Sequence, residues 1–304
     1  MSALLNYLGI LTAAYIALTL VLFMLSTRIP AAGFFARLLA SYIALIIAST
    51  YGVIVSTLLR IFGYGRISQW ATARCFKYAM WYGTGITFTV EDPNDWLNTT
   101  RPAVFIGNHQ TELDVLMLGC IFPKYCSVTA KKSLKSTPLL GWFMTLSKSV
   151  FIDRSNSNDA RAAMAGAAHE ITTEKQSVYM FPEGTRSYSK EPMLLPFKKG
   201  AFHLAVQAGV PIVPVVAANY SDVLYVKSWR FRSGSIPCKV LKPIETKNLK
   251  PSDVDDLARD TRELMLREII ALTSRARGHP VAMPATDPGD GVVKASGAEA
   301  TISR

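Results

Sequence analysis

The sequence predicts an α/β protein with a central sheet flanked by helices, preceded by a hydrophobic two-helix membrane anchor. Two uncharged, mostly apolar runs open the chain, over residues 1–27 and 38–59. After Pro102, short apolar runs alternate with helical patterns, which is typical of an α/β sheet. Only 18% of the 304 residues are charged. Ordinary soluble domains carry about 25%, so part of this chain is expected to lie in lipid.

Each of the two apolar runs is long enough for a helix that crosses a hydrocarbon core of about 30 Å. A signal peptide is the alternative for the first run, but the run lacks the positively charged start and short apolar core of such peptides. Residues 28–37 form the expected linker between the helices. Arg28 and Arg37 bracket this linker, and Pro30 and Gly33 are expected to break helical structure there.

The charges around these runs predict the orientation of the anchor. Four cations follow the second run before any acidic residue: Arg60, Arg66, Arg74 and Lys77. By the positive-inside rule they place the following domain in the cytosol. If both runs span the bilayer, however, Arg28 and Arg37 lie on the opposite side. A re-entrant hairpin that enters only one leaflet therefore stays open as an alternative.

Three segments are expected along the chain. Residues 1–67 form the membrane-anchoring region, and residues 68–275 form the globular domain that carries the motifs described below. Residues 276–304 are rich in Gly, Pro, Ala and Asp. This composition predicts a disordered tail.

Within the globular domain, six short apolar segments are expected to be strands: residues 104–107, 127–130, 150–152, 178–181, 210–217 and 238–241. Pro211 and Pro214 predict that the fifth of these is an edge strand or contains a bulge, because proline cannot donate to a sheet ladder. Helical spacing or composition predicts four helices: residues 113–122, 159–173, 198–208, and an amphipathic helix from Val254 onward.

The first candidate functional segment is Asn-His-Gln-Thr-Glu-Leu-Asp, residues 108–114. Its histidine, His109, follows a strand and precedes a helix. A lone histidine is more often structural, but Asp114 can turn back to the imidazole, hold one tautomer and stabilise the charged ring. The pair contains no nucleophile, so a substrate hydroxyl would supply it, and His109 would take the proton of that hydroxyl as general base.

The second candidate segment is Phe-Pro-Glu-Gly-Thr-Arg-Ser, residues 181–187. Its plain interpretation is a strand-to-turn connection with a surface arginine. Backbone N–H groups of a Gly-Thr turn can also point outward, however, and a guanidinium binds phosphate through two N–H donors. Two more cations are expected at the ends of neighbouring strands, and together they predict an anion pocket. The residues expected to form it are Lys131, Arg154, Glu183, Gly184, Thr185 and Arg186.

Other chemistries have less support. His109, Glu112 and Asp114 lack the His-Glu-x-x-His spacing, so no metal is expected. No Gly-x-Ser-x-Gly segment of a serine hydrolase occurs. The net charge of +11 suits an anionic membrane surface or an anionic substrate. Nucleic acid is not expected, because no recognition motif accompanies the charge. Four cysteines without a Cys-x-x-Cys pair favour a reducing, cytosol-facing environment.

Four segments occur in a fixed order: His109-x4-Asp114, and residues 151–154, 181–187 and 210–215. In this order they resemble the four blocks of the glycerolipid acyltransferase family. The resemblance is closest to the 1-acyl-sn-glycerol-3-phosphate (lysophosphatidate) acyltransferases of fungi, and it covers residues 68–245. Three further segments strengthen the closer match: residues 129–135, 140–144 and 195–203.

This resemblance implies transfer of a fatty acyl group from acyl-CoA to the sn-2 hydroxyl of 1-acyl-sn-glycerol 3-phosphate (lysophosphatidic acid). The products would be phosphatidic acid and CoA, in phospholipid biosynthesis at the endoplasmic reticulum membrane. Asp114 would orient His109 as the base, and Arg186, with Arg154 and Lys131, would hold the acceptor phosphate. Acyl-CoA is a substrate, so neither a bound cofactor nor a metal is expected.

Two alternatives stay open. Sister enzymes that acylate other lysophospholipids, such as lysophosphatidylinositol, share the His-x4-Asp pattern. A protein of a different class, a non-catalytic membrane protein that binds lipid or scaffolds partners, would have no need for the base that His109 and Asp114 provide.

Overall fold

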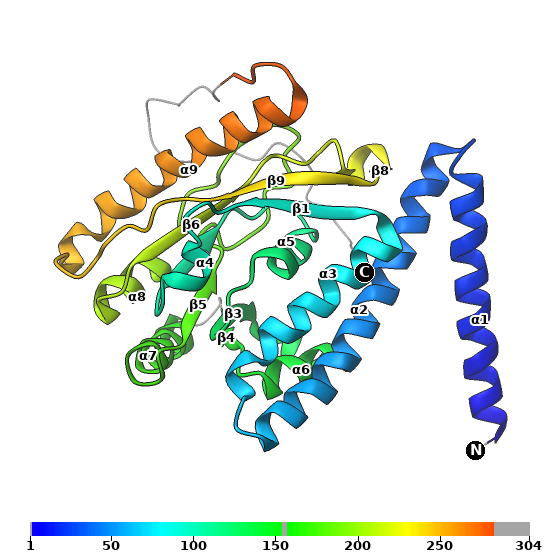
Figure 1. The fold of residues 1–304 in the computed structure, drawn as a ribbon, viewed down its shortest axis with the longest axis horizontal. Coiled ribbons are helices and arrows are strands. Elements are labelled where there is room, and N and C mark those ends of the chain that lie inside the picture. Colours follow the sequence, from blue (N-terminus) through cyan, green and yellow to red (C-terminus); the bar gives the residue numbers. More distant parts are fainter. Residues whose placement is uncertain (1, 154–156, 283–304) are drawn as a thin grey trace, which may run out of the picture.

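The computed structural model describes residues 2–153 and 157–282, and its centre is a seven-stranded sheet (Figure 1). The strand order is β1-β9-β6-β2-β5-β3-β4. The strands are β1 (Ile86–Glu91), β2 (Val104–Gly107), β3 (Cys126–Lys131), β4 (Val150–Ile152), β5 (Ser177–Met180), β6 (Ile212–Ala217) and β9 (Gly234–Val240). Neighbouring strands are parallel except β6 and β9, which are antiparallel. A short ribbon, β7 (Leu224–Tyr225) and β8 (Arg230–Phe231), lies apart from the sheet. The predicted α/β class is confirmed.

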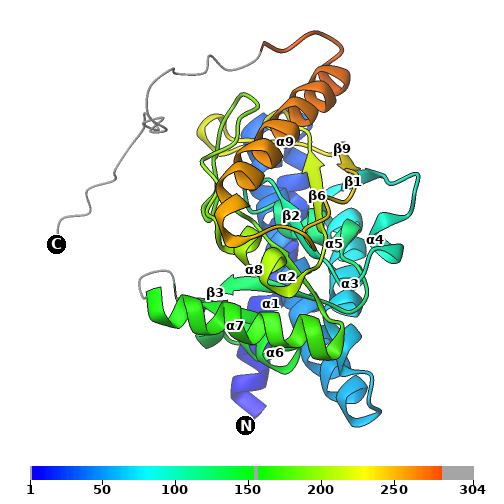
Figure 2. The ribbon, with the colours of Figure 1, turned by 90° about the vertical axis from the view of Figure 1, so that its left-hand side faces the viewer.

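Helices cover both faces of the sheet (Figures 1 and 2). They are α1 (Ser2–Leu25), α2 (Pro30–Ile61), α3 (Ser68–Thr84), α4 (Trp96–Thr99), α5 (Asp114–Ile121), α6 (Leu140–Leu146), α7 (Ser157–Glu174), α8 (Gly200–Ala208) and α9 (Val254–Arg277). Successive strand residues face opposite cores. Phe105 packs in the cluster that includes α2, α3 and α5, whereas Val104 and Ile106 pack in the cluster with α7, α8 and α9.

One of the two alternatives for residues 210–217, an edge strand, is wrong. Strand β6 lies between β9 and β2, near the middle of the sheet. Pro214 is tolerated there because the antiparallel ladder with β9 begins one residue later, at Val215. The carbonyl of Pro214 still accepts a hydrogen bond from the backbone N–H of Leu241, at 2.8 Å. Pro214 therefore lies between the isolated Ile212–Ile244 bridge and the ladder that begins at Val215, where its missing N–H is tolerated.

The expected linker at residues 28–37 is also shorter than predicted. Helix α2 begins at Pro30, so Gly33 and Arg37 lie inside it rather than breaking it. Proline fits the first turn of a helix, where its N–H would have no partner. The guanidinium of Arg37 donates to the carbonyls of Thr84 and Phe231, at 3.2 and 3.3 Å. These bonds hold the start of α2 against the globular domain.

Helices α1 and α2 are long and apolar enough to cross a membrane, over Leu4–Leu25 and Pro30–Ile61, with mean hydropathies of 2.4 and 2.1. Almost all of α1 is exposed, whereas α2 buries a row of small residues against the rest of the chain. An apolar helix exposed along its length requires an apolar environment. The two helices therefore indicate membrane association.

The amphipathic helix expected from Val254 is α9, and it ends at Arg277, two residues into the predicted tail. Residues 283–304, most of that tail, lie outside the described residues. Arg154, expected in the anion pocket, lies outside them too.

Candidate active site

His109 lies just beyond the carboxyl end of β2, at the edge of the sheet that the carboxyl ends of β5 and β3 share. Strand β2 ends at Gly107, where an added Cβ would collide with the hydroxyl of Tyr179 on β5. The chain can therefore pass close to its neighbouring strand only with glycine at this position. It then turns through residues 108–113 into α5, which begins at Asp114.

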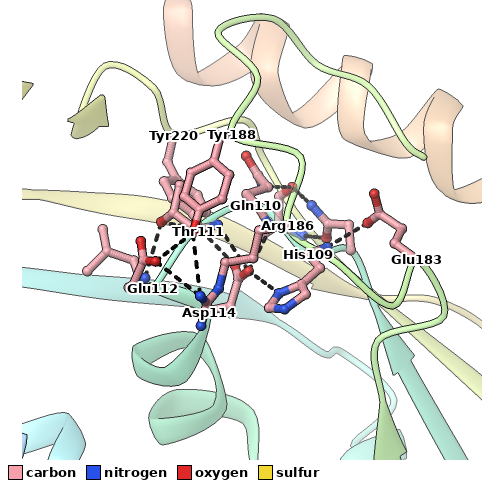
Figure 3. A network of polar contacts seen from close by, with 12 residues as sticks. His109, Gln110, Thr111, Glu112, Asp114, Glu183, Arg186, Tyr188 and Tyr220 are labelled. Carbon is pink, nitrogen blue, oxygen red and sulfur yellow. Dashed lines mark hydrogen bonds and ion pairs between the residues drawn. The ribbon is translucent and has the colours of Figure 1, made fainter. Parts of the chain in front are cut away.

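His109 and Asp114 form a close pair (Figure 3). The Nδ1 atom of His109 lies 2.7 Å from Oδ2 of Asp114. A carboxylate only accepts hydrogen bonds, so Nδ1 carries the proton and Nε2 keeps its lone pair. The imidazole stacks on Phe181, with 4.2 Å between ring centroids. The pair is thus fixed in the tautomer that a general base at Nε2 requires.

Asp114 is only 1% exposed, and hydrogen-bond donors surround its carboxylate. Besides His109, the backbone N–H groups of Gln110 and Thr111 donate to Oδ2, at 2.6 and 3.2 Å. The hydroxyl of Tyr220 donates to Oδ1, at 2.7 Å. Such donors stabilise a buried carboxylate in its charged form.

Tyr220 was not among the residues expected at the site. It follows β6, it is buried, and burial raises the pKa of its phenol well above the usual range. Its oxygen lies 3.1 Å from both the backbone nitrogen and the hydroxyl of Thr111. The sequence offers no signal for this contact, because Tyr220 and Asp114 lie 106 residues apart.

Glu183 is 3% exposed and points at the backbone. Its Oε1 accepts the N–H of His109 at 2.7 Å, and its Oε2 accepts the N–H of Leu195 at 2.8 Å. Burial raises the pKa of Glu183 to about 7, although the two backbone N–H groups favour the carboxylate. The Glu183 side chain therefore connects the backbone at His109 with the backbone at Leu195, and so it positions His109.

The next residues form the turn itself. Gly184 has a φ of +72°, and the side chain of Lys198 packs where a Cβ would project, so a larger residue is disfavoured. Thr185 is exposed at the tip of the turn.

Arg186 lies beside His109 because the turn pairs with the His109 loop. The N–H of Ser187 donates to the carbonyl of His109 at 3.0 Å, and the N–H of Tyr188 donates to the carbonyl of Gln110 at 3.1 Å. Figure 3 shows both residues within one network of polar contacts.

The cation of Arg186 already holds an anionic group in this structure. Its Nη1 lies 3.0 Å from Oε1 of Glu112, and the hydroxyl of Tyr188 donates to the same oxygen at 2.6 Å. Nε of Arg186 is buried and has no hydrogen-bond partner among the described residues. Arg186 therefore binds the Glu112 carboxylate through Nη1, while its Nε–H is unused among the described residues.

Lys131 ends β3, is exposed, and lies at the same edge of the sheet, with β5 between its strand and β2. The neighbouring Lys132 is instead paired with Asp153 and Asp159, at 3.6 and 2.8 Å. Of the expected site residues, the structure brings together His109, Asp114, Glu183, Gly184, Thr185 and Arg186. In the described ranges, no group of three or more His, Cys, Asp or Glu side chains is arranged to hold a metal ion.

Comparisons with known proteins show which family the chain resembles. Residues 88–218 match the family model described as Acyltransferase. The chain is 44% identical over 216 residues to the 1-acyl-sn-glycerol-3-phosphate acyltransferase of Saccharomyces cerevisiae, covering 71% of each chain. It is 40% identical to the human 1-acyl-sn-glycerol-3-phosphate acyltransferase alpha, over 59% of this chain and 62% of the human one.

A solved structure shares the fold. The crystal structure of the 1-acyl-sn-glycerophosphate (LPA) acyltransferase PlsC from Thermotoga maritima matches with a TM-score of 0.61 at 22% identity. The match covers 87% of this chain and 98% of that one. The resemblance drawn from the four sequence blocks is confirmed by the curated relatives, and the chain belongs to the 1-acyl-sn-glycerol-3-phosphate acyltransferase family.

Proposed function

We propose that this enzyme transfers a fatty acyl group from acyl-CoA to the sn-2 hydroxyl of lysophosphatidic acid, giving phosphatidic acid and CoA. The observation that carries the proposal is the position of Arg186 beside the His109–Asp114 pair, fixed by the bond from the Ser187 N–H to the His109 carbonyl. A base and an anion-binding cation side by side suit an acceptor that carries a hydroxyl and a phosphate. The names of the relatives support this choice of acceptor.

In the proposed reaction, Nε2 of His109 takes the proton of the acceptor hydroxyl as its oxygen attacks the thioester carbonyl. Asp114 stabilises the imidazolium that forms, through the bond at Nδ1. The tetrahedral intermediate then collapses, the C–S bond breaks, and the CoA sulfur leaves with the proton returned by the imidazolium. The new ester bond and the released thiol balance the reaction without a metal or bound cofactor.

The acceptor phosphate would replace Glu112 on Arg186. The Glu112 carboxylate occupies the position of an anion on Nη1 of Arg186, and a phosphate there can also accept from Nη2 in a bidentate contact. Lys131, at the same sheet edge, would add a cation, and Arg154 is proposed as a third. Displacement costs little, because exposed ion pairs contribute about 0–1 kcal/mol.

We also propose that the enzyme is anchored at the endoplasmic reticulum with its catalytic domain in the cytosol. The bonds from Arg37 to Thr84 and Phe231 keep the start of α2 at the globular domain. This arrangement favours a re-entrant hairpin over a linker on the far side of the bilayer. Attachment of sugar to the exposed Asn98 of the Asn98-Thr99-Thr100 sequon would contradict a cytosolic domain.

The proposal is tested by CoA release from a long-chain acyl-CoA by the purified full-length protein in detergent micelles. Release should depend on added lysophosphatidic acid and should yield phosphatidic acid. A panel with lysophosphatidylinositol, lysophosphatidylcholine and glycerol 3-phosphate tests the acceptor. Faster release with another lysophospholipid would replace the acceptor, and no release with any of them would reject catalysis in favour of a lipid-binding role.

A further inference from the structure

We propose that Tyr220 is a positioning residue for this reaction. Its hydroxyl fixes the Asp114 carboxylate, and this carboxylate in turn orients His109 and stabilises the imidazolium that forms. The inference rests on the proposed role of His109 as base. The hydroxyl of Tyr220 bonds to Asp114 and Thr111, so it acts on His109 through Asp114.

The two carboxylate oxygens of Asp114 have separate tasks. Oδ2 accepts from His109 and from the N–H groups of Gln110 and Thr111, whereas Oδ1 accepts from the hydroxyl of Tyr220 at 2.7 Å. Tyr220 is therefore the side chain that prevents the carboxylate from rotating. Without it, a buried oxygen would lack a donor, and a carboxylate with fewer donors holds its charge less well.

The direction of each hydrogen bond around Tyr220 can be assigned. The N–H of Leu113 donates to the hydroxyl oxygen of Thr111 at 3.2 Å. A carboxylate only accepts, so the phenol donates its one proton to Oδ1 of Asp114. The Thr111 hydroxyl therefore donates to the phenol oxygen at 3.1 Å, and so does the Thr111 N–H, which it shares with Oδ2 of Asp114. The network thus requires a neutral Tyr220 facing a charged Asp114.

The loop that carries Tyr220 is itself anchored by α9. The N–H of Asn219 donates to the hydroxyl of Thr273 at 2.8 Å. The guanidinium of Arg277 donates to the side chains of Asn219 and Ser221, on either side of Tyr220, at 3.0 and 3.1 Å. The ring of Tyr220 packs edge-on against Phe88, with 5.9 Å between centroids. Tyr220 therefore comes to Asp114 on a rigid support, as a positioning residue requires.

The test is Tyr220→Phe, which removes only the hydroxyl. The matched control is Tyr179→Phe, because Tyr179 is also fully buried near the site but its hydroxyl has no partner among the described residues. We expect Tyr220→Phe to lower kcat about 10- to 100-fold, the effect of one hydrogen bond to a charged group. KM for both substrates should stay within about threefold, and the pH–rate profile should change, because Asp114 bonds directly to His109. Tyr179→Phe should change none of these.

A readout independent of turnover is the proton NMR signal of Nδ1–H of His109, which lies far downfield when this proton bonds to a carboxylate. It should shift in Tyr220→Phe and stay in place in Tyr179→Phe. An unshifted signal with an unchanged pH profile would overturn the inference, even if the variant is slower. A shifted signal in a protein that transfers no acyl group would reject the proposed function and keep the positioning contact.

If Tyr220→Phe does not accumulate as folded protein, Thr111→Val serves instead. It removes one of the two donors to the Tyr220 oxygen and leaves the bond from Tyr220 to Asp114 in place. The expected change is in the same direction but smaller, a few-fold in kcat. A KM effect without a kcat effect would overturn the inference.

Discussion

The two halves of the active site are held in opposite ways. The His109–Asp114 half is buried, and its carboxylate accepts from His109, Gln110, Thr111 and Tyr220. The Arg186 half lies near the surface: the arginine side chain is 35% exposed, and its partner Glu112 is 58% exposed. In the first half both oxygens of the Asp114 carboxylate have donors within the protein, whereas the second half binds a replaceable carboxylate.

This difference fits the proposed division of labour. A base contributes when its geometry is fixed before the reaction, because reorganisation would then cost nothing in the transition state. An anion clamp must bind a substrate phosphate and later release a product that carries the same phosphate. A half-exposed cation with an exposed partner can exchange anions at little cost.

The largest expected effect comes from breaking the fixed half. His109→Ala should lower kcat about 10²- to 10⁴-fold, the contribution of a general base. The measurement is CoA release by purified protein in the presence of lysophosphatidic acid. His203→Ala, a change at an exposed histidine on α8, is the control and should retain activity. Retained activity in His109→Ala, at equal protein level, would reject the base.

Breaking the exchangeable half should affect binding instead. Arg186→Ala should raise KM for lysophosphatidic acid about tenfold or more, because a hydrogen-bonded charge pair is lost. KM for acyl-CoA should change much less. Arg259→Ala, on the exposed side of α9, controls for loss of surface charge. Equal increases in both KM values would mean that Arg186 has a structural role.

Glu183 connects the two halves, since it precedes the Arg186 turn and accepts the N–H of His109. Glu183→Gln places an amide NH2 against a backbone N–H, so one of its two bonds is lost, and kcat should fall about fivefold. The exposed Glu263→Gln is the control and should leave kcat unchanged.

Stability against pH gives a second test of Glu183. Burial raises the pKa of Glu183 to about 7, from an ordinary value of 4.5. Because the pKa of Glu183 is higher in the folded than in the unfolded protein, its contribution to stability is fully present below pH 4.5. This contribution, about 3 kcal/mol, is lost as the pH rises to about 7. The Tm of the wild type should fall over this interval, and Glu183→Gln should flatten the fall. Parallel Tm curves for the two proteins would contradict the burial of this carboxyl.

The fixed half was also the more predictable from sequence. The His109–Asp114 contact is local, since five residues and the start of a helix bring the two side chains together, and residue spacing alone anticipates it. Glu183 was expected in the anion pocket, but its side chain accepts the backbone N–H of His109. This contact joins the loops that follow two adjacent strands, β5 and β2. The contact of Tyr220 with Asp114 depends on the position of β6 in the sheet, which cannot be deduced from the residue types alone.

The same limit explains the misjudged elements. Prolines in β6 suggested an edge strand, but the start of the ladder with β9 decides the outcome. Gly33 was expected to break helical structure, but it lies buried within α2, near the side chain of Arg37. Its packing against the rest of the chain therefore outweighs its low helix propensity. Strand β1 is not among the expected strands, although Ile86 and Phe88 alternate with threonines, a pattern that predicts a half-buried strand.

The smallest expected effect sharpens the comparison at its weak point, the ion pair of Arg186 with Glu112. If Glu112 only occupies the clamp until phosphate arrives, Glu112→Gln should lower KM for lysophosphatidic acid about two- to fivefold, as expected for loss of an exposed ion pair. kcat should not change, because the base is untouched, and the exposed Glu245→Gln should have no effect. A rise in KM would instead mean that Glu112 and Tyr188 hold Arg186 in its binding position. The direction of this small change therefore decides whether the clamp is exchangeable or as firmly held as the base.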